Sequence, residues 1–253
     1  MATNYRGMIP GTFTMGNVVC GFVAILSAID GKILTGAWFI ILAGFLDVLD
    51  GKVARLSGGS SQFGVELDSL ADFLSFGVAP AVLVYSLKLP ILGDLGWVII
   101  SAVYIIAAAY RLARYNLLAE TDEKKDFVGL PVPAAAMLLI TYVIFCYELF
   151  DGIQYSEWLV SMIVVSALLM VSQVEYESLP DRFDNRKAFI RLVVIVIAAV
   201  AALWRPRLLL FPFVAIYILL GMIREFYRLF AAGARKVTGR NGHKTHNQEE
   251  EQD

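Results

Sequence analysis

The sequence has little histidine, little cysteine and little charge, and each scarcity excludes a class of protein. Its only two histidines, His243 and His246, lie in the polar C-terminal stretch. A histidine-based catalytic triad or a histidine-ligated zinc site in the folded body is therefore excluded. Its only two cysteines, Cys20 and Cys146, fall inside apolar runs, so we expect buried side chains and no secreted-type disulfide framework. The formal net charge of −2 is too balanced to indicate a nucleic-acid partner.

What the chain has in excess is apolar side chain. Of its 253 residues, 58% are hydrophobic and 17% are charged, whereas about 25% charged residues is typical of soluble domains. The mean hydropathy is +0.67. A water-soluble core of this size cannot enclose so much apolar surface, and the composition therefore predicts an integral membrane protein.

Long apolar runs without period-2 alternation predict an all-α, polytopic membrane protein. Each crossing needs roughly 20 apolar residues, and helices satisfy their own backbone hydrogen bonds in lipid. The first run has neither a strongly basic leader nor a cleavage-type site, so we expect it to be an uncleaved helix. We predict eight spans, at 8–28, 33–51, 65–87, 97–117, 131–149, 156–174, 188–204 and 207–230.

The distribution of charge predicts the orientation and the domain plan. With eight spans, most of the 21 lysines and arginines fall on one side, and only Lys32, Lys88, Arg205 and Arg207 fall on the other. The positive-inside rule then places both termini in the cytoplasm, and a plasma (inner) membrane is our default. Residues 1–232 are the expected transmembrane catalytic domain. Residues 233–253 are an expected polar cytoplasmic tail, either disordered or weakly attracted to anionic lipid.

Four aspartates stand beside apolar runs at helical spacing. Asp47 and Asp50 are three residues apart, and Asp68 and Asp72 are four apart, so each pair shares one face of a helix. Carboxylates near lipid cost several kcal/mol when uncompensated and repel one another. Oxygen-only ligands suit Mg²⁺ or Mn²⁺, and four carboxylates can hold two ions about 3.5–4 Å apart, as in sites that clamp phosphoryl groups. The alternative, four solvated acids at span ends, does not explain the paired spacing.

Small residues and one arginine lie between the two aspartate pairs. Gly51, Gly64 and Ala54 allow a ligand or a facing helix to approach the backbone. Arg55 supplies a guanidinium fork for a phosphate oxygen. The stretch therefore predicts a metal-assisted site for a phosphate-containing substrate at the cytoplasmic edge of the membrane.

The whole stretch, D-x2-D-G-x2-A-R-x8-G-x3-D-x3-D from Asp47 to Asp72, matches without departure the motif of the CDP-alcohol phosphatidyltransferases. The resemblance implies a six-helix core, here with two additional helices, and a homodimer. It implies that an acceptor hydroxyl attacks the β-phosphorus of a CDP-linked lipid and that CMP leaves. By the same resemblance Asp47, Asp50, Asp68 and Asp72 bind two divalent cations, and Asp72 is also the base. Gly51, Ala54 and Arg55 would contact the CDP moiety.

Further segments resemble the membrane-spanning phosphatidylserine synthase branch of this family: 73–81, 110–116 and 127–135. Residues 10–17 also resemble it, except that Gly11 stands where the branch usually has asparagine; Thr14 and Asn17 remain candidates for CDP binding. The resemblance implies CDP-diacylglycerol and L-serine as substrates within membrane lipid. Three alternatives stay open: a sister enzyme for inositol or glycerol 3-phosphate, an archaetidylserine synthase, and, in another class, a cation-coupled transporter, which predicts acids spread through the bilayer depth.

The acceptor pocket is less determined by the sequence. Arg111 and Arg114 are three residues apart at a cytoplasmic helix end. They are either arginines snorkelling at the membrane boundary or ligands of the serine carboxylate or a lipid phosphate. Ser75 and Asn116 are further polar candidates for this pocket. Glu66 is next to the site but off the Asp68/Asp72 face, so we expect no role for it.

Overall fold

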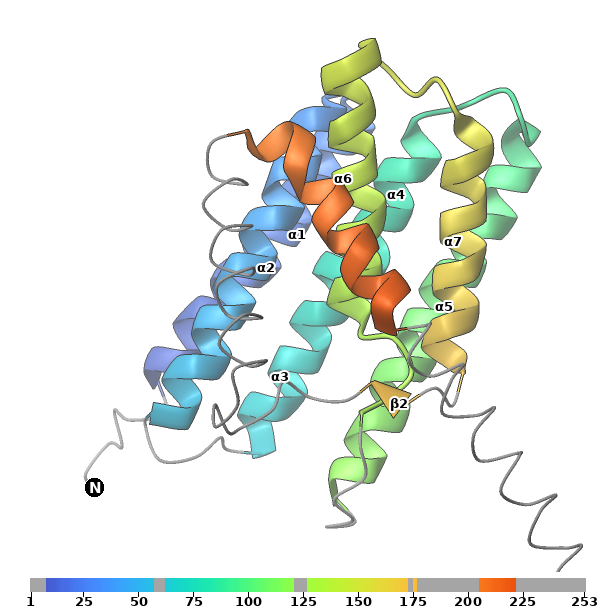
Figure 1. Cartoon of the computed structure of the whole chain (residues 1–253). Coiled ribbons are helices and arrows are strands. Elements are labelled where there is room, and N and C mark those ends of the chain that lie inside the picture. The colour runs from blue at the N-terminus through green and yellow to red at the C-terminus, as the bar shows by residue number, and fades with distance from the viewer. Residues whose placement is uncertain (1–7, 57–61, 121–126, 173–174, 177–204, 222–253) are drawn as a thin grey trace, which may run out of the picture. The chain divides into compact units, whose positions relative to one another are not determined.

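The computed structural model describes residues 8–56, 62–120, 127–172, 175–176 and 205–221, and within them the chain is helical apart from two short strands (Figure 1). The predicted span 188–204 and the predicted tail 233–253 lie outside the described residues. The elements are α1 (Met8–Ile29), α2 (Ile33–Leu56), α3 (Gln62–Asp72), the π-helix η2 (Phe73–Val78), α4 (Ala79–Ser86), α5 (Gly93–Glu120), β1 (Phe127–Val128), α6 (Val132–Phe150), α7 (Ser156–Val171) and β2 (Glu175–Tyr176). A further helix runs over Pro206–Gly221.

Five helical stretches in the described residues are long and apolar enough to cross a membrane. Two further apolar helices, Ser156–Val171 and Pro206–Gly221, are shorter. The first five predicted spans therefore correspond to candidate membrane spans, and the sixth corresponds to a helix shorter than predicted. The eighth begins in the helix Pro206–Gly221, and its residues 222–230 lie outside the described residues. The helical class and the membrane character are confirmed, whereas the count of eight stays a prediction. The five are Gly11–Ile29, Ile33–Val53, Gln62–Ser86, Gly93–Leu117 and Val132–Phe150.

The chain divides into two compact units, Met1–Val214 and Ala215–Asp253. In the first unit, α1 packs along α2, α5 packs against α7, and α6 packs against α2 (Figure 1). Small residues make the first of these contacts close: a Cβ on Gly36 of α2 would lie 2.9 Å from the backbone oxygen of Ala24 on α1. Small side chains at such crossings are how helices associate in lipid. In the second unit the described residues, 215–221, are helical.

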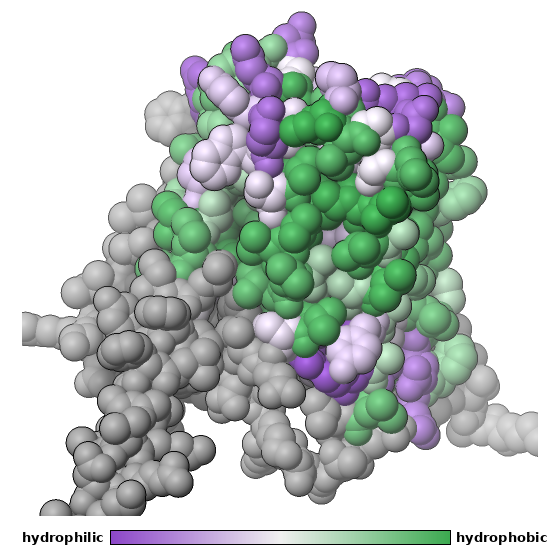
Figure 2. Space-filling view, turned by 90° about the vertical axis from the view of Figure 1, so that its right-hand side faces the viewer, coloured by the Kyte–Doolittle hydropathy of each residue, from purple (hydrophilic) through white to green (hydrophobic). Residues whose placement is uncertain are grey.

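The outer surface has the polarity expected of a protein in lipid. Figure 2 shows apolar residues over the middle of one face and hydrophilic residues gathered near its upper and lower ends. Exposed apolar side chains on α5 include Leu95, Ile99 and Ile106, which are 72%, 55% and 66% exposed. Such exposure of large apolar side chains is costly in water and favourable in a bilayer. Cys20 and Cys146 are both buried, as predicted.

The third span is one continuous helical stretch with a change of hydrogen-bond pattern inside it. Residues 73–78 form a π-helix that begins directly after Asp72 and leads into α4. A π-turn bonds residue i to i+5 and is found mostly as a single bulge at functional sites. One inserted residue rotates everything beyond it by about 100° relative to an uninterrupted α-helix. The bulge therefore determines which of the residues after Asp72 face α1.

The connection between α5 and α6 is attached to the end of α7. Strands β1 and β2 pair antiparallel, with Phe127 opposite Tyr176, and the Leu130 amide donates to the Leu169 carbonyl at 3.1 Å. Gly129, between β1 and Leu130, has φ +85°, a conformation that favours glycine. Pro131 caps α6, and a proline lies in its first turn, which fits the fixed φ of proline at a helix start.

Candidate active site

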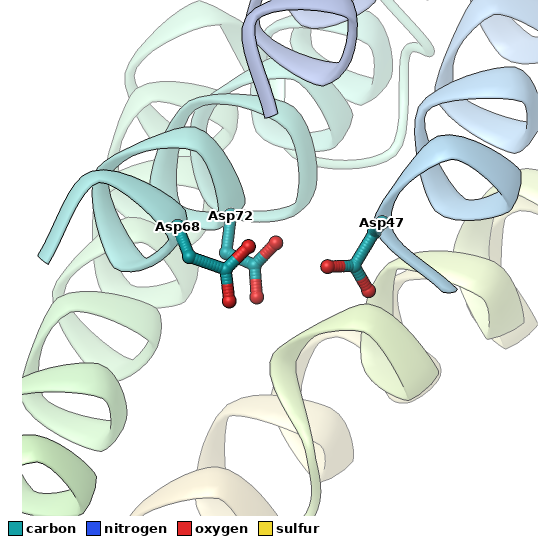
Figure 3. A group of neighbouring side chains, drawn as sticks. All are labelled: Asp47, Asp68 and Asp72. Carbon is teal, nitrogen blue, oxygen red and sulfur yellow. The ribbon is translucent and has the colours of Figure 1, made fainter. Parts of the chain in front are cut away.

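Three aspartates from two helices come together. Asp47 lies in the second half of α2, and Asp68 and Asp72 lie in the last part of α3. One carboxylate oxygen of each lies within 4.8 Å of the others, and Figure 3 shows the three side chains pointing toward one another. In the described part of the chain, no salt bridge neutralises any of these three residues, which we call the acidic cluster.

Asp50 is the fourth expected member, and it is not among the three carboxylates that come within 4.8 Å of one another. Its side chain is buried, with 5% exposure, and one of its oxygens accepts a hydrogen bond from the Thr14 hydroxyl of α1. The other oxygen, Oδ1, has no hydrogen-bond partner among the described residues. The structure thus brings together three of the four aspartates, because Thr14 holds the fourth toward α1.

Asn17 lies one turn beyond Thr14 on α1 and contacts a member of the acidic cluster. It is fully buried, and its Nδ2 donates to Asp72 Oδ1 at 3.4 Å. Its Oδ1 has no partner among the described residues. Thr14 and Asn17, which the sequence assigns to nucleotide binding, therefore each hold one of the aspartates.

The donor set fits a divalent cation. Three carboxylate oxygens within 4.8 Å of one another and a buried Asp50 oxygen without a hydrogen-bond partner in the described structure are all hard, anionic ligands. Such oxygens suit Mg²⁺ or Mn²⁺, and like charges this close need a counter-ion. The acidic cluster is therefore a group that can hold a divalent cation.

The small residues of the motif are only partly described. A Cβ on Gly51 would meet no described atom within 4 Å. Gly64 lies in the first turn of α3 and is half-buried. The side chains of Ala54 and Arg55 lie outside the described part of the structure.

The two arginines of α5 differ in what they contact. Arg111 is 5% exposed, and its guanidinium lies 5.6 Å from the centre of the Tyr115 ring. Its Nε has no hydrogen-bond partner among the described residues. Arg114 instead donates from Nη1 to the Val171 carbonyl at 3.2 Å and from Nη2 to the Ser172 carbonyl at 3.0 Å. Arg114 therefore satisfies carbonyls at the end of α7, which a helix leaves without intrahelical partners.

Ser75 and Asn116 both make hydrogen bonds within the protein. Ser75 is fully buried, and its hydroxyl donates to the backbone oxygen of Asn17 at 2.9 Å. Asn116 Nδ2 lies 3.0 Å from Ser69 Oγ and 3.5 Å from Glu66 Oε2. Asn116 thereby joins the end of α5 to α3, a contact that sequence reasoning missed. The polar pair at i, i+3 on α3, Glu66 and Ser69, was the available signal.

Comparison with known proteins identifies the family. The model of the CDP-alcohol phosphatidyltransferase family matches residues 7–172. The chain belongs to this family. All four motif aspartates, both arginines of α5 and the polar residues of α1 lie inside the matched region.

Relatives in the CDP-alcohol phosphatidyltransferase family include named enzymes. A Helicobacter pylori CDP-diacylglycerol–serine O-phosphatidyltransferase is 35% identical over 229 residues, covering 90% of this chain and 94% of the relative. A Mycobacterium tuberculosis protein of the same name is 32% identical, covering 83% of this chain and 75% of the relative. An archaetidylserine synthase of Methanothermobacter thermautotrophicus is 34% identical, covering 66% and 69%. The chain is thus similar to transferases of phospholipid biosynthesis.

Proposed function

We propose that this chain transfers the phosphatidyl group of CDP-diacylglycerol to the hydroxyl of L-serine, giving phosphatidylserine and CMP. The convergence of Asp47, Asp68 and Asp72 carries the proposal, because it supplies the anionic oxygens that a metal-assisted phosphoryl transfer needs. The names of relatives that align over most of the chain support serine as the acceptor.

The aspartates would hold two divalent cations, Mg²⁺ or Mn²⁺, with Asp50 contributing its buried Oδ1 beside the acidic cluster. When bound, such ions neutralise the diphosphate and stabilise the departing CMP. Asp72 accepts the proton as the serine oxygen bonds to the β-phosphorus and the bond from that phosphorus to the CMP oxygen breaks. Asn17 Nδ2 engages Asp72 Oδ1, which leaves Oδ2 for the proton.

The CDP moiety would lie against Gly51, Ala54 and Arg55, with Thr14 and Asn17 on the α1 side. The open space beside Gly51 supports a close approach of the nucleotide to the backbone. Thr14 and Asn17 both contact aspartates of the site, so a nucleotide there would lie next to the cations.

The acceptor pocket would be centred on Arg111, with Arg114, Ser75 and Asn116 around it. Arg111 is buried, and its guanidinium makes no hydrogen bond to a described residue, so an anion such as the serine carboxylate or a lipid phosphate would satisfy it. Arg114, Ser75 and Asn116 already donate within the protein. We therefore assign the direct anion contact to Arg111.

The chain would cross the membrane eight times as a six-helix core plus two helices, form a homodimer, and face the cytoplasm of a plasma membrane with both termini and the site. Residues 1–232 would form the catalytic domain and 233–253 a cytoplasmic tail. In this arrangement CDP-diacylglycerol enters laterally from the bilayer, while serine and CMP exchange with the cytosol.

The test is CMP release by the purified protein with CDP-diacylglycerol and Mg²⁺ or Mn²⁺, comparing serine, inositol, glycerol 3-phosphate and choline. We expect release with serine. Release only with another alcohol would transfer the chain to a sister activity. Because one relative is an archaetidylserine synthase, a parallel arm supplies the CDP-activated ether lipid; a clear preference for it would replace the diacyl substrate.

A further inference from the structure

Helix α1 and the π-helix η2 cross in near-backbone contact directly after Asp72. A Cβ on Gly21 of α1 would first meet the Ser75 hydroxyl oxygen, and it would lie 3.0 Å from Ser75 Cα and 3.1 Å from Ser75 Cβ. The Ser75 hydroxyl is held by its hydrogen bond to α1, and Ser75 Cα cannot move aside without moving the backbone of η2. Only glycine at position 21 lets the two helices approach this closely.

The hydroxyl of Ser75 fastens this crossing. Ser75 is fully buried, and its hydroxyl donates a hydrogen bond to the backbone oxygen of Asn17 at 2.9 Å. Asn17 and Gly21 are four residues apart on α1 and lie on one face. On the other stretch, Asp72 and Ser75 both face α1, because each is hydrogen-bonded to Asn17. The same Asn17 donates its side-chain Nδ2 to Asp72 at 3.4 Å.

We propose that the Gly21–Ser75 crossing positions Asn17 against Asp72, and that Ser75 is a positioning residue which does not touch the acceptor. The inference rests on the proposed function in taking Asp72 as the base. It differs from the acceptor contact for which the sequence makes Ser75 a candidate, because a fully buried hydroxyl that already donates to α1 cannot reach a ligand without opening the crossing.

The sharpest variant is Gly21→Ala, with Gly11→Ala as its matched control. Both add one methyl group to α1, but a Cβ on Gly11 meets no described atom within 4 Å. Because the Asn17–Asp72 contact is already long for a hydrogen bond, separating the helices breaks it. We expect kcat to fall at least about tenfold in Gly21→Ala, since small misplacements cost up to about a hundredfold. The KM for serine stays within about twofold, and Gly11→Ala keeps wild-type values.

Ser75→Ala removes the hydroxyl and adds no volume. We expect kcat to fall about three- to tenfold with an unchanged KM for serine. In Gly21→Ala/Ser75→Ala the loss should be smaller than the product of the single losses, because both changes open one crossing. In Gly11→Ala/Ser75→Ala the losses should multiply. If Gly21→Ala cannot be purified as a folded protein, Ser75→Ala alone decides.

Thermal unfolding in detergent with EDTA supplies a readout without turnover: the Tm losses of Gly21→Ala and Ser75→Ala should be non-additive. A raised KM for serine with unchanged kcat in Ser75→Ala would make Ser75 an acceptor contact and overturn the proposal. A lowered Tm with unchanged kcat would reduce the crossing to packing, and additive losses would separate the two residues. Wild-type CMP release is measured first. If another alcohol proves to be the acceptor, the proposed function fails, and the crossing is judged on kcat and KM with that alcohol.

Discussion

The acidic cluster and the arginines of α5 differ in how their charges are paired. The acidic cluster has no cationic side chain paired with it in the described residues, whereas Arg114 donates to two carbonyls of α7. Asn116 of α5 connects the two regions, because its side chain hydrogen-bonds to Ser69 on α3. The comparison separates a charge that is paired within the fold from charges that are free to bind the proposed ligands.

The same distinction divides the two arginines. Arg114 hydrogen-bonds to the carbonyls at the end of α7, a contact that we call the Arg114 clamp. Arg111 is buried against the Tyr115 ring, and its Nε has no acceptor among the described residues. A buried charge without a partner is costly, which supports the proposal that Arg111 binds an anionic ligand. Arg111 therefore resembles the acidic cluster more than it resembles its neighbour.

The largest expected effect is that of Asp72→Asn, which tests whether the acidic cluster does chemistry. The amide keeps the shape but cannot accept the serine proton, so CMP release should fall by at least about a thousandfold. Asp94→Asn is the matched control, because Asp94 is an exposed carboxylate in the first turn of α5; it should retain wild-type turnover. Full activity in Asp72→Asn would remove the base assignment.

Metal removal should have the next largest effect. Chelation with EDTA should abolish CMP release, and Mg²⁺ or Mn²⁺ should restore it. An ion that binds only the folded protein stabilises it by about 2.7 kcal/mol at a hundred times its Kd, so the Tm of the wild type should rise on metal addition. The rise should shrink in Asp47→Asn and Asp68→Asn but not in Asp94→Asn. Equal rises in all four proteins would locate the ion elsewhere.

The spacing of residues was enough to predict the acidic cluster but not the position of Asp50. Pairs at i, i+3 and i, i+4 share a helix face whatever surrounds them, so Asp68 and Asp72 could be placed together from sequence. Whether Asp50 joins Asp47 depends on Thr14, 36 residues away, whose hydroxyl takes one of its oxygens. Such contacts between distant segments leave no local pattern in the sequence.

Hydropathy alone was enough to predict the first five spans, but it could not predict the crossing of α1 with η2. Hydropathy follows the bilayer thickness, so the predicted span 131–149 lies within one residue of α6 at Val132–Phe150. The π-helix after Asp72 and the Gly21–Ser75 contact depend on two helices meeting, and period alone treats Phe73–Val78 as ordinary helix. The pairing of Arg114 with α7 carbonyls, 57 and 58 residues away, was hidden likewise.

The two arginines should respond differently to replacement by lysine, which keeps the charge and removes the planar fork. Arg111→Lys should raise the KM for serine about tenfold, the equivalent of about 1.4 kcal/mol of lost binding. Arg114→Lys should leave that KM within about twofold and lower the Tm by about 2–6 °C, because a hydrogen bond from a charged group is lost. The reverse assignment of KM and Tm effects would mean that Arg114 is the anion ligand.

The smallest effect on turnover is expected at Gly129, where the Arg114 clamp meets the α5–α6 connection. A Cβ there would lie 2.7 Å from the Met170 carbonyl and 2.9 Å from Arg114 Nη2, at φ +85°. Gly31 has φ +75° and no described atom within 4 Å of its Cβ position, so Gly31→Ala measures the cost of the backbone conformation alone, about 1–2 kcal/mol. Gly129→Ala should lower the Tm further than Gly31→Ala while kcat changes less than about threefold, because the clamp supports the fold and not the chemistry. Equal Tm losses would show that the contacts of Arg114 with the α7 carbonyls adjust to the added methyl group without loss of stability. A large loss of kcat would show that Arg114 contributes to the active site.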